Sequence, residues 1–228
     1  MKYFIVSFIK FILSLILFIF SETYFYKLLD ILKISISYDL ANIILYLLLG
    51  FAVYIIFKDE VANDIKRFKR KIGNKILYSV IFFLILFIIV LISDYVVNVL
   101  SNSFYLTYNE VNFYNIFNKP FNLNLIAEIV RNILMLPFIK VLIFSLGINR
   151  LFNGSKSIFF SGLSYAIYNA FLLDGSISYI LVNSFIPFII FVIITYSFHK
   201  SNNIMVSVLV LILYTVFASP LYSIILRG

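Results

Sequence analysis

The sequence predicts an all-α, multi-pass integral membrane protein, and three observations lead to this prediction. Of the 228 residues, 63% are hydrophobic and 12% are charged, with a mean hydropathy of +1.07, whereas roughly a quarter of a soluble domain is charged. Several apolar stretches approach the ~20 residues that a helix needs to cross a bilayer core of ~30 Å. They are continuous rather than alternating, which excludes the strands of an outer-membrane barrel.

We expect about seven transmembrane helices (six to eight) of the length that a bilayer requires. Their predicted positions are 3–20, 39–57, 76–93, 125–148, 157–173, 176–198 and 204–225. The first could be a signal peptide, but its length and the lack of a small-residue cleavage site favour a retained helix. Segment 24–38 is predicted to lie along the membrane interface. Short turns at 174–175 and 199–203 make the last three spans antiparallel neighbours, and the spans contain Pro137, Pro187 and Pro220, which should kink them.

The distribution of Lys and Arg predicts the orientation in the membrane. Loop 58–75 is strongly basic, and cytoplasmic loops carry an excess of Lys and Arg. We therefore place this loop and the N-terminus in the cytoplasm and loop 94–124 outside. The chain divides into N-terminal helices (1–124, including the basic loop) and a membrane core (125–228). The net charge of +8 is attributed to these loops, so the expected partner is the lipid bilayer and not nucleic acid. A contact of the basic loop with anionic headgroups is a second reading, at ~1 kcal/mol per base.

Composition also limits the chemistry of the chain. It contains no cysteine, and His199 is its single histidine, which excludes thiolate chemistry and a histidine-rich metal site. We expect no catalytic residue, no bound metal and no cofactor. Phe, Ile, Tyr, Asn and Lys are abundant while Trp is absent, as AT-rich codons would produce. The predicted location is the cell membrane of a bacterium with an AT-rich genome.

Ionisable residues inside a span are candidate functional groups because a bilayer makes them costly. Glu128, Arg131 and Lys140 all lie in span 125–148. Glu128 and Arg131 are three residues apart, so they share a helix face and can form an ion pair. That pair could be structural or part of a substrate or ion pathway, and Lys140 could extend to the interface. Asn169 is the mid-membrane amide that most needs a partner.

Residues 125–220 contain three blocks whose spacing resembles a known family. Their sequences are PFIKVLIFSLGINRLF at 137–152, SGLSYAIYN at 161–169 and KSNNIMVSVLVLILYT at 200–215. These blocks resemble the Pro-x-x-Glu-Glu-x-x-Phe-Arg-Gly, Phe-x-x-x-His and His-x-x-x-Asn motifs of the CAAX protease and bacteriocin-processing (CPBP, or Abi) family. The resemblance implies the fold of an intramembrane metalloprotease core.

The same resemblance implies that the catalytic set has been lost. In the family, glutamates and histidines are thought to bind the metal and activate water. The first block has Lys140 and Val141 at the glutamate positions and Ser145 at the arginine position. The second has Tyr165 and Asn169 in place of Phe and His, and the third has Leu211 and Thr215 in place of His and Asn. Lysine, valine and leucine cannot supply the ligands of a catalytic zinc ion.

Three functional hypotheses follow from these residues. The leading one is a CPBP-like protein without protease activity that binds, assembles or regulates another membrane protein or a peptide. The second is a small-solute transporter or the substrate-capture subunit of one, consistent with the kinking prolines and the charged fourth span. The third is an enzyme that uses Glu128, but pairing with Arg131 would keep this carboxylate ionised and weakly basic.

Overall fold

The structure is a computed structural model that describes residues 2–103 and 121–227. Every regular element in these residues is a helix, which confirms the all-α prediction. The first half comprises α1 (Lys2–Ile31), α2 (Tyr38–Ile56), α3 (Lys58–Arg70) and α4 (Ile72–Ser103). The predicted loop 94–124 is therefore helical up to Ser103, and its segment 104–120 lies outside the described residues.

The second half begins with one long helix whose backbone changes hydrogen-bonding pattern along its length. Its successive parts are α5 (Leu123–Glu128), the π-helix η1 (Ile129–Met135), α6 (Leu136–Lys140), the π-helix η2 (Val141–Gly147) and α7 (Ile148–Leu151). It is followed by α8 (Ser155–Ala170), α9 (Ile177–Ser201) and α10 (Ile204–Arg227). Pro137 has no N–H to donate to the preceding turn, and η1 ends just before it with a wider bond from Leu136 N–H to the Arg131 carbonyl.

Side chains mark where several helices begin. Ser37, Asn122 and Ser176 each accept a hydrogen bond from the backbone N–H three residues later, at the starts of α2, α5 and α9. Such caps satisfy N–H groups that have no partner inside the helix. The α9–α10 turn reverses at Asn202, whose φ of 49° is left-handed, the conformation that Asn tolerates better than most residues.

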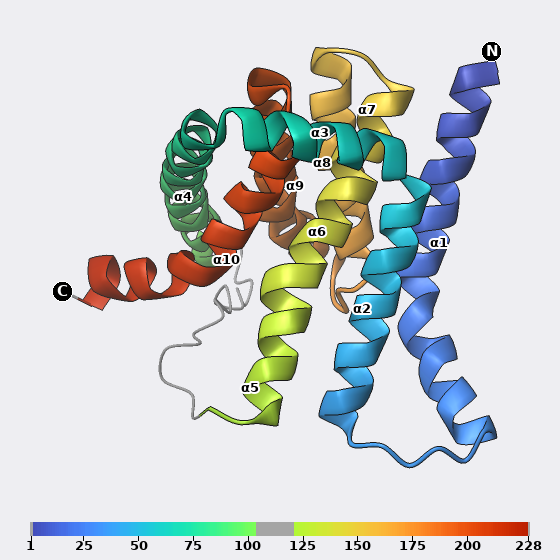
Figure 1. Ribbon diagram of the computed structural model, residues 1–228. Coiled ribbons are helices and arrows are strands. Elements are labelled where there is room, and N and C mark those ends of the chain that lie inside the picture. Colours follow the sequence, from blue (N-terminus) through green and yellow to red (C-terminus); the bar gives the residue numbers. More distant parts are fainter. Residues whose placement is uncertain (1, 104–120, 228) are drawn as a thin grey trace.

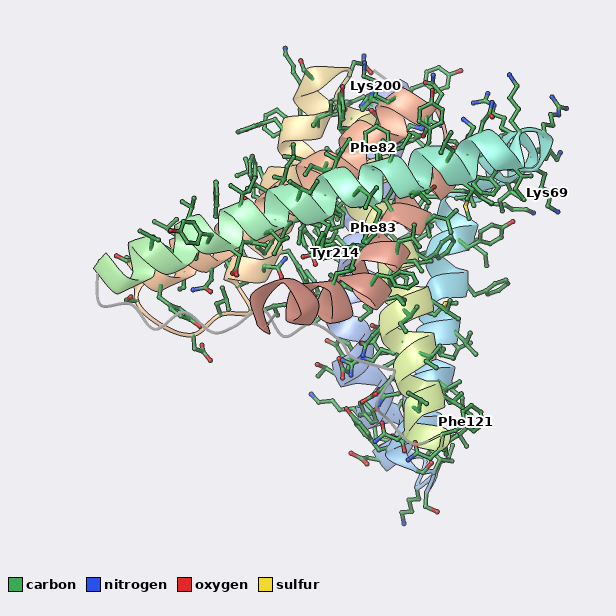
Figure 2. All side chains as sticks on the ribbon, turned by 90° about the vertical axis from the view of Figure 1, so that its left-hand side faces the viewer. Lys69, Phe82, Phe83, Phe121, Lys200 and Tyr214 are labelled. Atoms are coloured by element: carbon green, nitrogen blue, oxygen red, sulfur yellow. The ribbon has the colours of Figure 1, made fainter. Side chains whose placement is uncertain are left out.

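Helices α1, α2 and the α5–α7 helix stand side by side, with α8 and α9 behind them (Figure 1). Viewed from the side, α4 runs across the bundle rather than parallel to α2 and α5 (Figure 2). Phe82 and Phe83 on α4 meet Tyr196 of α9 and Phe217 of α10 edge to face or tilted. The centre of the bundle contains η2, whose residues are all buried.

Five helices are long and apolar enough to cross a membrane, as judged by length and composition in the part of the chain that the structure describes. They cover Tyr3–Ile31, Tyr38–Ile56, Ile72–Val97, Leu123–Leu151 and Ile177–Ser201. Helix α8 and the apolar part of α10 (Ile204–Ala218) are shorter. The chain is therefore a multi-helix membrane protein, and the predicted count of seven spans is not reproduced by this criterion.

Two predicted segments differ from the structure. Segment 24–38 is not a separate interfacial helix, because α1 continues without interruption to Ile31; residues 20–31 contain no Gly or Pro that would break it. The basic loop 58–75 is mostly helical. Helix α3 has Asp59 and Glu60 in its first turn and basic residues in its last turn. Charges in this order interact favourably with the helix dipole and stabilise the helix.

Candidate functional site

The interior site that the sequence emphasised is centred on Lys140, at the junction of α6 and η2. Its ammonium donates a hydrogen bond to the Tyr165 hydroxyl of α8 at 2.9 Å and lies 5.3 Å from the centre of the same ring. Lys140 is half-buried and Tyr165 is 8% exposed. Lys140 therefore bonds into the bundle in this structure, whereas the sequence suggested that it extends to the interface.

Aromatic rings pack around the Tyr165 ring. The Tyr165 ring lies 3.9 Å from that of Phe191 and 5.2 Å from that of Phe144, centre to centre. Phe144 also packs edge to face against Phe191 and tilted against Tyr168. Rings at such separations attract each other beyond the effect of area burial. The Lys140 ammonium therefore contacts a tyrosine that is itself held in a cluster of aromatic rings.

The other motif-aligned positions are satisfied within their own helices or buried. Asn169 Nδ2 donates to the Tyr165 carbonyl at 2.8 Å, and Thr215 Oγ1 donates to the Leu211 carbonyl at 2.9 Å. Val141 and Leu211 belong to the hydrophobic core. Ser145 is fully buried, and its Oγ has no hydrogen-bond partner in the residues that the structure describes. Asn169, expected at mid-membrane, lies next to the last residue of α8 and finds its partner one turn back on the same helix.

The acidic residues and the histidine are spread over several helices. Over residues 2–103 and 121–227, no group of three His, Asp or Glu side chains could hold a metal ion. His199, expected in a turn, lies in α9 because that helix extends to Ser201, and its Nε2 is 2.7 Å from Ser157 Oγ of α8. The single histidine is therefore used in a contact between two helices.

A second polar cluster lies between α1, α2 and η1. Arg131 Nη2 is 3.9 Å from Glu22 Oε1 of α1, and the guanidinium carbon lies 5.1 Å from the centre of the Tyr46 ring of α2. Beside them, Tyr26 donates a hydrogen bond to Asn42 Oδ1 at 3.0 Å. Arg131 thus faces a carboxylate on another helix, Glu22, which the sequence did not single out. Its pairing with Glu128 stays a prediction.

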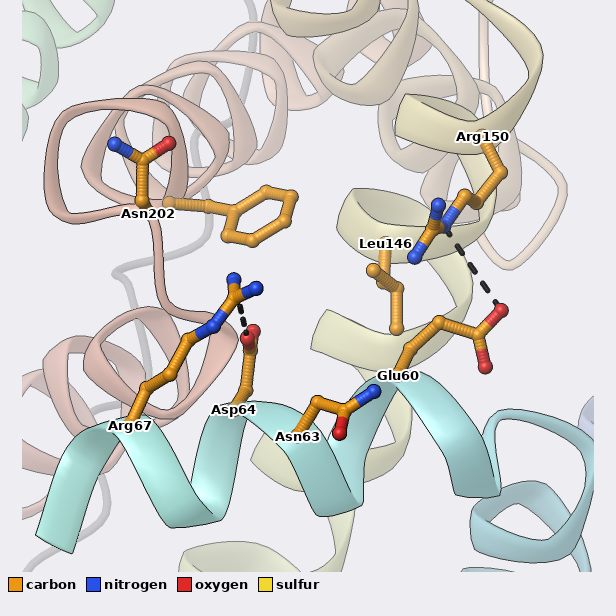
Figure 3. Close-up of a pocket in the computed structure, with 8 residues that line it drawn as sticks. Glu60, Asn63, Asp64, Arg67, Leu146, Arg150 and Asn202 are labelled. Carbon is orange, nitrogen blue, oxygen red and sulfur yellow. Dashed lines mark ion pairs between the residues drawn. The ribbon is translucent and has the colours of Figure 1, made fainter.

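A third cluster surrounds a polar pocket of about 170 Å³ next to α3 (Figure 3). Its lining residues come from α3, from η2 and α7, and from the end of α9: Glu60, Asn63, Asp64, Arg67, Leu146, Arg150, Phe198 and Asn202. Figure 3 shows Arg150 of α7 directed at Glu60, at 3.9 Å, and Arg67 above Asp64, at 3.7 Å. Sequence reasoning missed this site because its members lie far apart in the chain.

Asp64 joins α3 to the α9–α10 turn. Its Oδ2 accepts the Ile204 N–H at 2.8 Å, and its carbonyl accepts Asn203 Nδ2 at 2.7 Å. The Asp64 carboxylate therefore caps α10 from a different helix. Burial raises the pKa of Asp64 above its ordinary value, and the bond from Ile204 and the charge of Arg67 only partly oppose this. Lys75 of α4 donates a hydrogen bond to the carbonyl of Ser201 at the end of α9, which links a further helix to this turn.

Comparison of this chain with models of protein families, with curated proteins and with solved structures finds no match.

Proposed function

We propose that this chain is a CPBP-like protein of a bacterial cell membrane that has lost its metal ligands and acts by binding, assembling or regulating another membrane protein. The observation that carries the proposal is the bond between Lys140 and Tyr165. These residues belong to two different aligned motifs, and the shared framework would require those motifs to meet inside the bundle. Their contact therefore supports the proposal.

The chemistry of this contact argues against a catalytic role for the site. A zinc centre of the family type needs carboxylate and imidazole ligands, which attract the ion. Here an ammonium occupies the aligned glutamate position and would repel a divalent cation at short range. The Tyr165 ring that contacts this ammonium packs against Phe144 and Phe191. The site is better suited to holding three helices together than to activating water.

The proposal includes seven spans with a cytoplasmic N-terminus, counting α8 and α10 as short spans. Its support is that the basic and connecting segments lie at one end of the bundle, where Figure 1 places the N-terminus, α3 and α7. Lys10 of α1 contacts Glu60 of α3, and Asn203 of the α9–α10 turn contacts Asp64 of α3. A common cytoplasmic face would bring these segments together.

The proposal is tested on the full chain purified into vesicles. CAAX-type and leader peptides are incubated with it in the presence of zinc or a chelator, and we expect no cleavage in either case. In parallel, membranes with native expression levels are solubilised gently, and we expect the chain to migrate with a second membrane protein. Zinc-dependent cleavage, or a chain that migrates only as a monomer, would sink the proposal.

A second candidate function is solute transport, and one observation favours it. The Glu22–Arg131 pair and the hydrogen-bonded Tyr26 and Asn42 lie within apolar helices, where ionisable groups often mark pathways. The adjacent η1 segment is a π-helix, a form often found at functional sites. Thermal stabilisation by one compound in a vitamin and metabolite screen, reduced in Arg131→Gln, would support transport; no stabilisation across the screen would count against it.

A further inference from the structure

An apolar groove separates α1 from α8. Its volume is about 470 Å³, within the range of about 300–1,000 Å³ typical of small-molecule sites. The residues that line it include Phe11, Leu15 and Ile19 of α1 and Ile167, Tyr168 and Phe171 of α8 and its C-terminal turn. The α1 residues follow one another at intervals of four, so they form one face along ~12 Å of the helix axis. The groove is thus elongated along α1.

Three charged residues cluster near the end of α1 that carries the N-terminus. Lys10 Nζ lies 3.3 Å from Glu60 Oε1, and Arg150 Nε lies 3.9 Å from the same oxygen. Two cations thus share one carboxylate, which leaves the cluster with one net positive charge (two minus one). Glu60 Oε2 is buried and has no hydrogen-bond partner in the residues that the structure describes. One anion would balance the net charge of the cluster.

The charged cluster and the groove adjoin each other. Lys10 immediately precedes Phe11, and Phe11 lies against η2, where its Cδ2 is 3.0 Å from the position that a Cβ on Gly147 would occupy. Arg150 is three residues beyond Gly147, about one turn along the same helix. Figure 1 places the N-terminal end of α1 and α7 at the same end of the bundle. A polar head at the cluster would therefore direct a chain into the groove.

We propose that this surface binds one phosphatidylglycerol molecule. Its phosphate accepts hydrogen bonds from Lys10 and Arg150, which neutralises the net charge of the cluster. One acyl chain occupies the groove between α1 and α8. Phosphatidylcholine is zwitterionic, so it does not neutralise the cluster. This inference depends on the membrane location of the chain and not on the CPBP proposal.

The test uses the full chain, delipidated in detergent and titrated with phosphatidylglycerol, phosphatidylethanolamine or phosphatidylcholine of identical acyl chains. Native mass spectrometry counts bound lipids, and thermal unfolding reports stabilisation. We expect phosphatidylglycerol to bind about tenfold more tightly than phosphatidylcholine, as charge-assisted hydrogen bonds would produce. Equal retention of all three lipids, or tighter binding of phosphatidylethanolamine, overturns the proposal. This arm requires only the unaltered protein.

Matched variants locate the site. Lys10→Gln should reduce the preference for phosphatidylglycerol, and Lys69→Gln, which removes an equal charge at the exposed end of α3, should leave it unchanged. Leu15→Trp fills the groove and should weaken binding, while Ile16→Trp, at the neighbouring exposed position of α1, should not. Equal losses in both members of either pair would indicate a diffuse basic surface or ordinary boundary lipid and would overturn the proposal. Full protection by glycerol phosphate alone would also overturn it, because the groove would then contribute nothing.

Discussion

Helix α8 forms two contrasting interfaces. The α8–α9 seam (Ser157, Ser161 and Gly162 against Thr195 and His199) brings two helices into close contact. Ser161 Oγ and Thr195 Oγ1 are 2.6 Å apart, and both residues are fully buried. Nearer the C-terminal end of α8, the α1–α8 groove leaves about 470 Å³ between largely apolar side chains. Small polar residues allow membrane helices to approach closely, whereas large apolar side chains hold them apart.

The two interfaces differ in how tightly their helices pack. Lipid tails are as apolar as leucine, so burying an apolar side chain gains little in a membrane, and association depends on close packing and hydrogen bonds. The α8–α9 seam has both. Helix α1 has many exposed apolar side chains, such as Ile16, and contacts its neighbours over a limited surface. Substitutions in the seam should therefore reduce the free energy of unfolding far more than equivalent substitutions along the groove.

The largest effect is expected from Gly162→Leu in the seam. A Cβ at Gly162 would lie 2.8 Å from the Phe188 carbonyl oxygen and 2.6 Å from Val192 Cγ2, and the backbone oxygen cannot move aside. We expect a loss of about 3 kcal/mol in the free energy of unfolding, at the upper end for overpacking. The control is Gly73→Leu at an exposed position with nothing within 4 Å, which should be neutral or slightly stabilising. Chemical denaturation measures both variants, and an equal loss of unfolding free energy in the two would refute the close approach of α8 and α9.

A matched isoleucine pair compares the two regions directly. Ile194 of α9 is fully buried, whereas Ile19, which lines the groove, is 46% exposed. Ile194→Ala should reduce the free energy of unfolding by about 2 kcal/mol, because the cavity it leaves loses packing contacts. Ile19→Ala should cost less than about 1 kcal/mol because its surroundings are already open. Similar losses for both variants would mean that α1 packs as tightly as α9.

Substitutions at Asp64 test whether α3 contributes to the stability of the bundle through its bond to the α9–α10 turn. Asp64→Ala removes the acceptor for the Ile204 N–H, and losing such a cap typically costs about 1 kcal/mol. Asp64→Asn keeps a side-chain oxygen as acceptor and should retain most of that stability. The two variants are compared in chemical denaturation at neutral pH, and an equal loss in both would show that the charge, not the cap, matters.

The same residue predicts a pH dependence. Burial raises the pKa of Asp64 in the folded chain, so folding favours its protonated form. The stability gained from protonation is therefore complete below the ordinary carboxyl pKa and is lost as the pH rises through the raised one. Asp64→Asn should lack this decline, so its stability relative to the unaltered chain should increase from acidic to neutral pH. A constant difference across that range would contradict the raised pKa.

The smallest effect is expected from the buried hydrogen bond of the seam. Ser161→Ala removes one partner of the bond to Thr195, and bonds between membrane helices contribute about 0.6 kcal/mol on average. Adding Thr195→Val should cost less than the sum of the two single changes, because the second partner is already lost. Strict additivity in this double-mutant cycle would show that the two hydroxyl groups do not interact.

The sequence by itself determined the fold class and most helix positions. Its apolar stretches exceed the length of soluble core helices, so the predicted spans 39–57 and 176–198 agree with α2 and α9 to within a few residues. The same signal was weak where charge interrupts it. Segment 58–75 was expected to be a loop because it is polar, yet α3 forms there with Val61 and Asp64 buried against the bundle. Hydropathy cannot detect a helix that is stabilised by a few long-range contacts.

The tertiary structure alone decided which polar groups meet. Sequence spacing predicts Glu128 as a partner of Arg131 because it detects neighbours on one helix face, and that pairing stays a prediction. It could not point to Glu22, over one hundred residues away, which also lies opposite the guanidinium. Lys140 was identified from its position in an apolar span, whereas its partner Tyr165 depends on how α8 packs against η2. The capping of α10 by Asp64 and the sharing of Glu60 by Lys10 and Arg150 have the same origin. Periodicity specifies contacts within a helix, but contacts between helices depend on packing that no local pattern encodes.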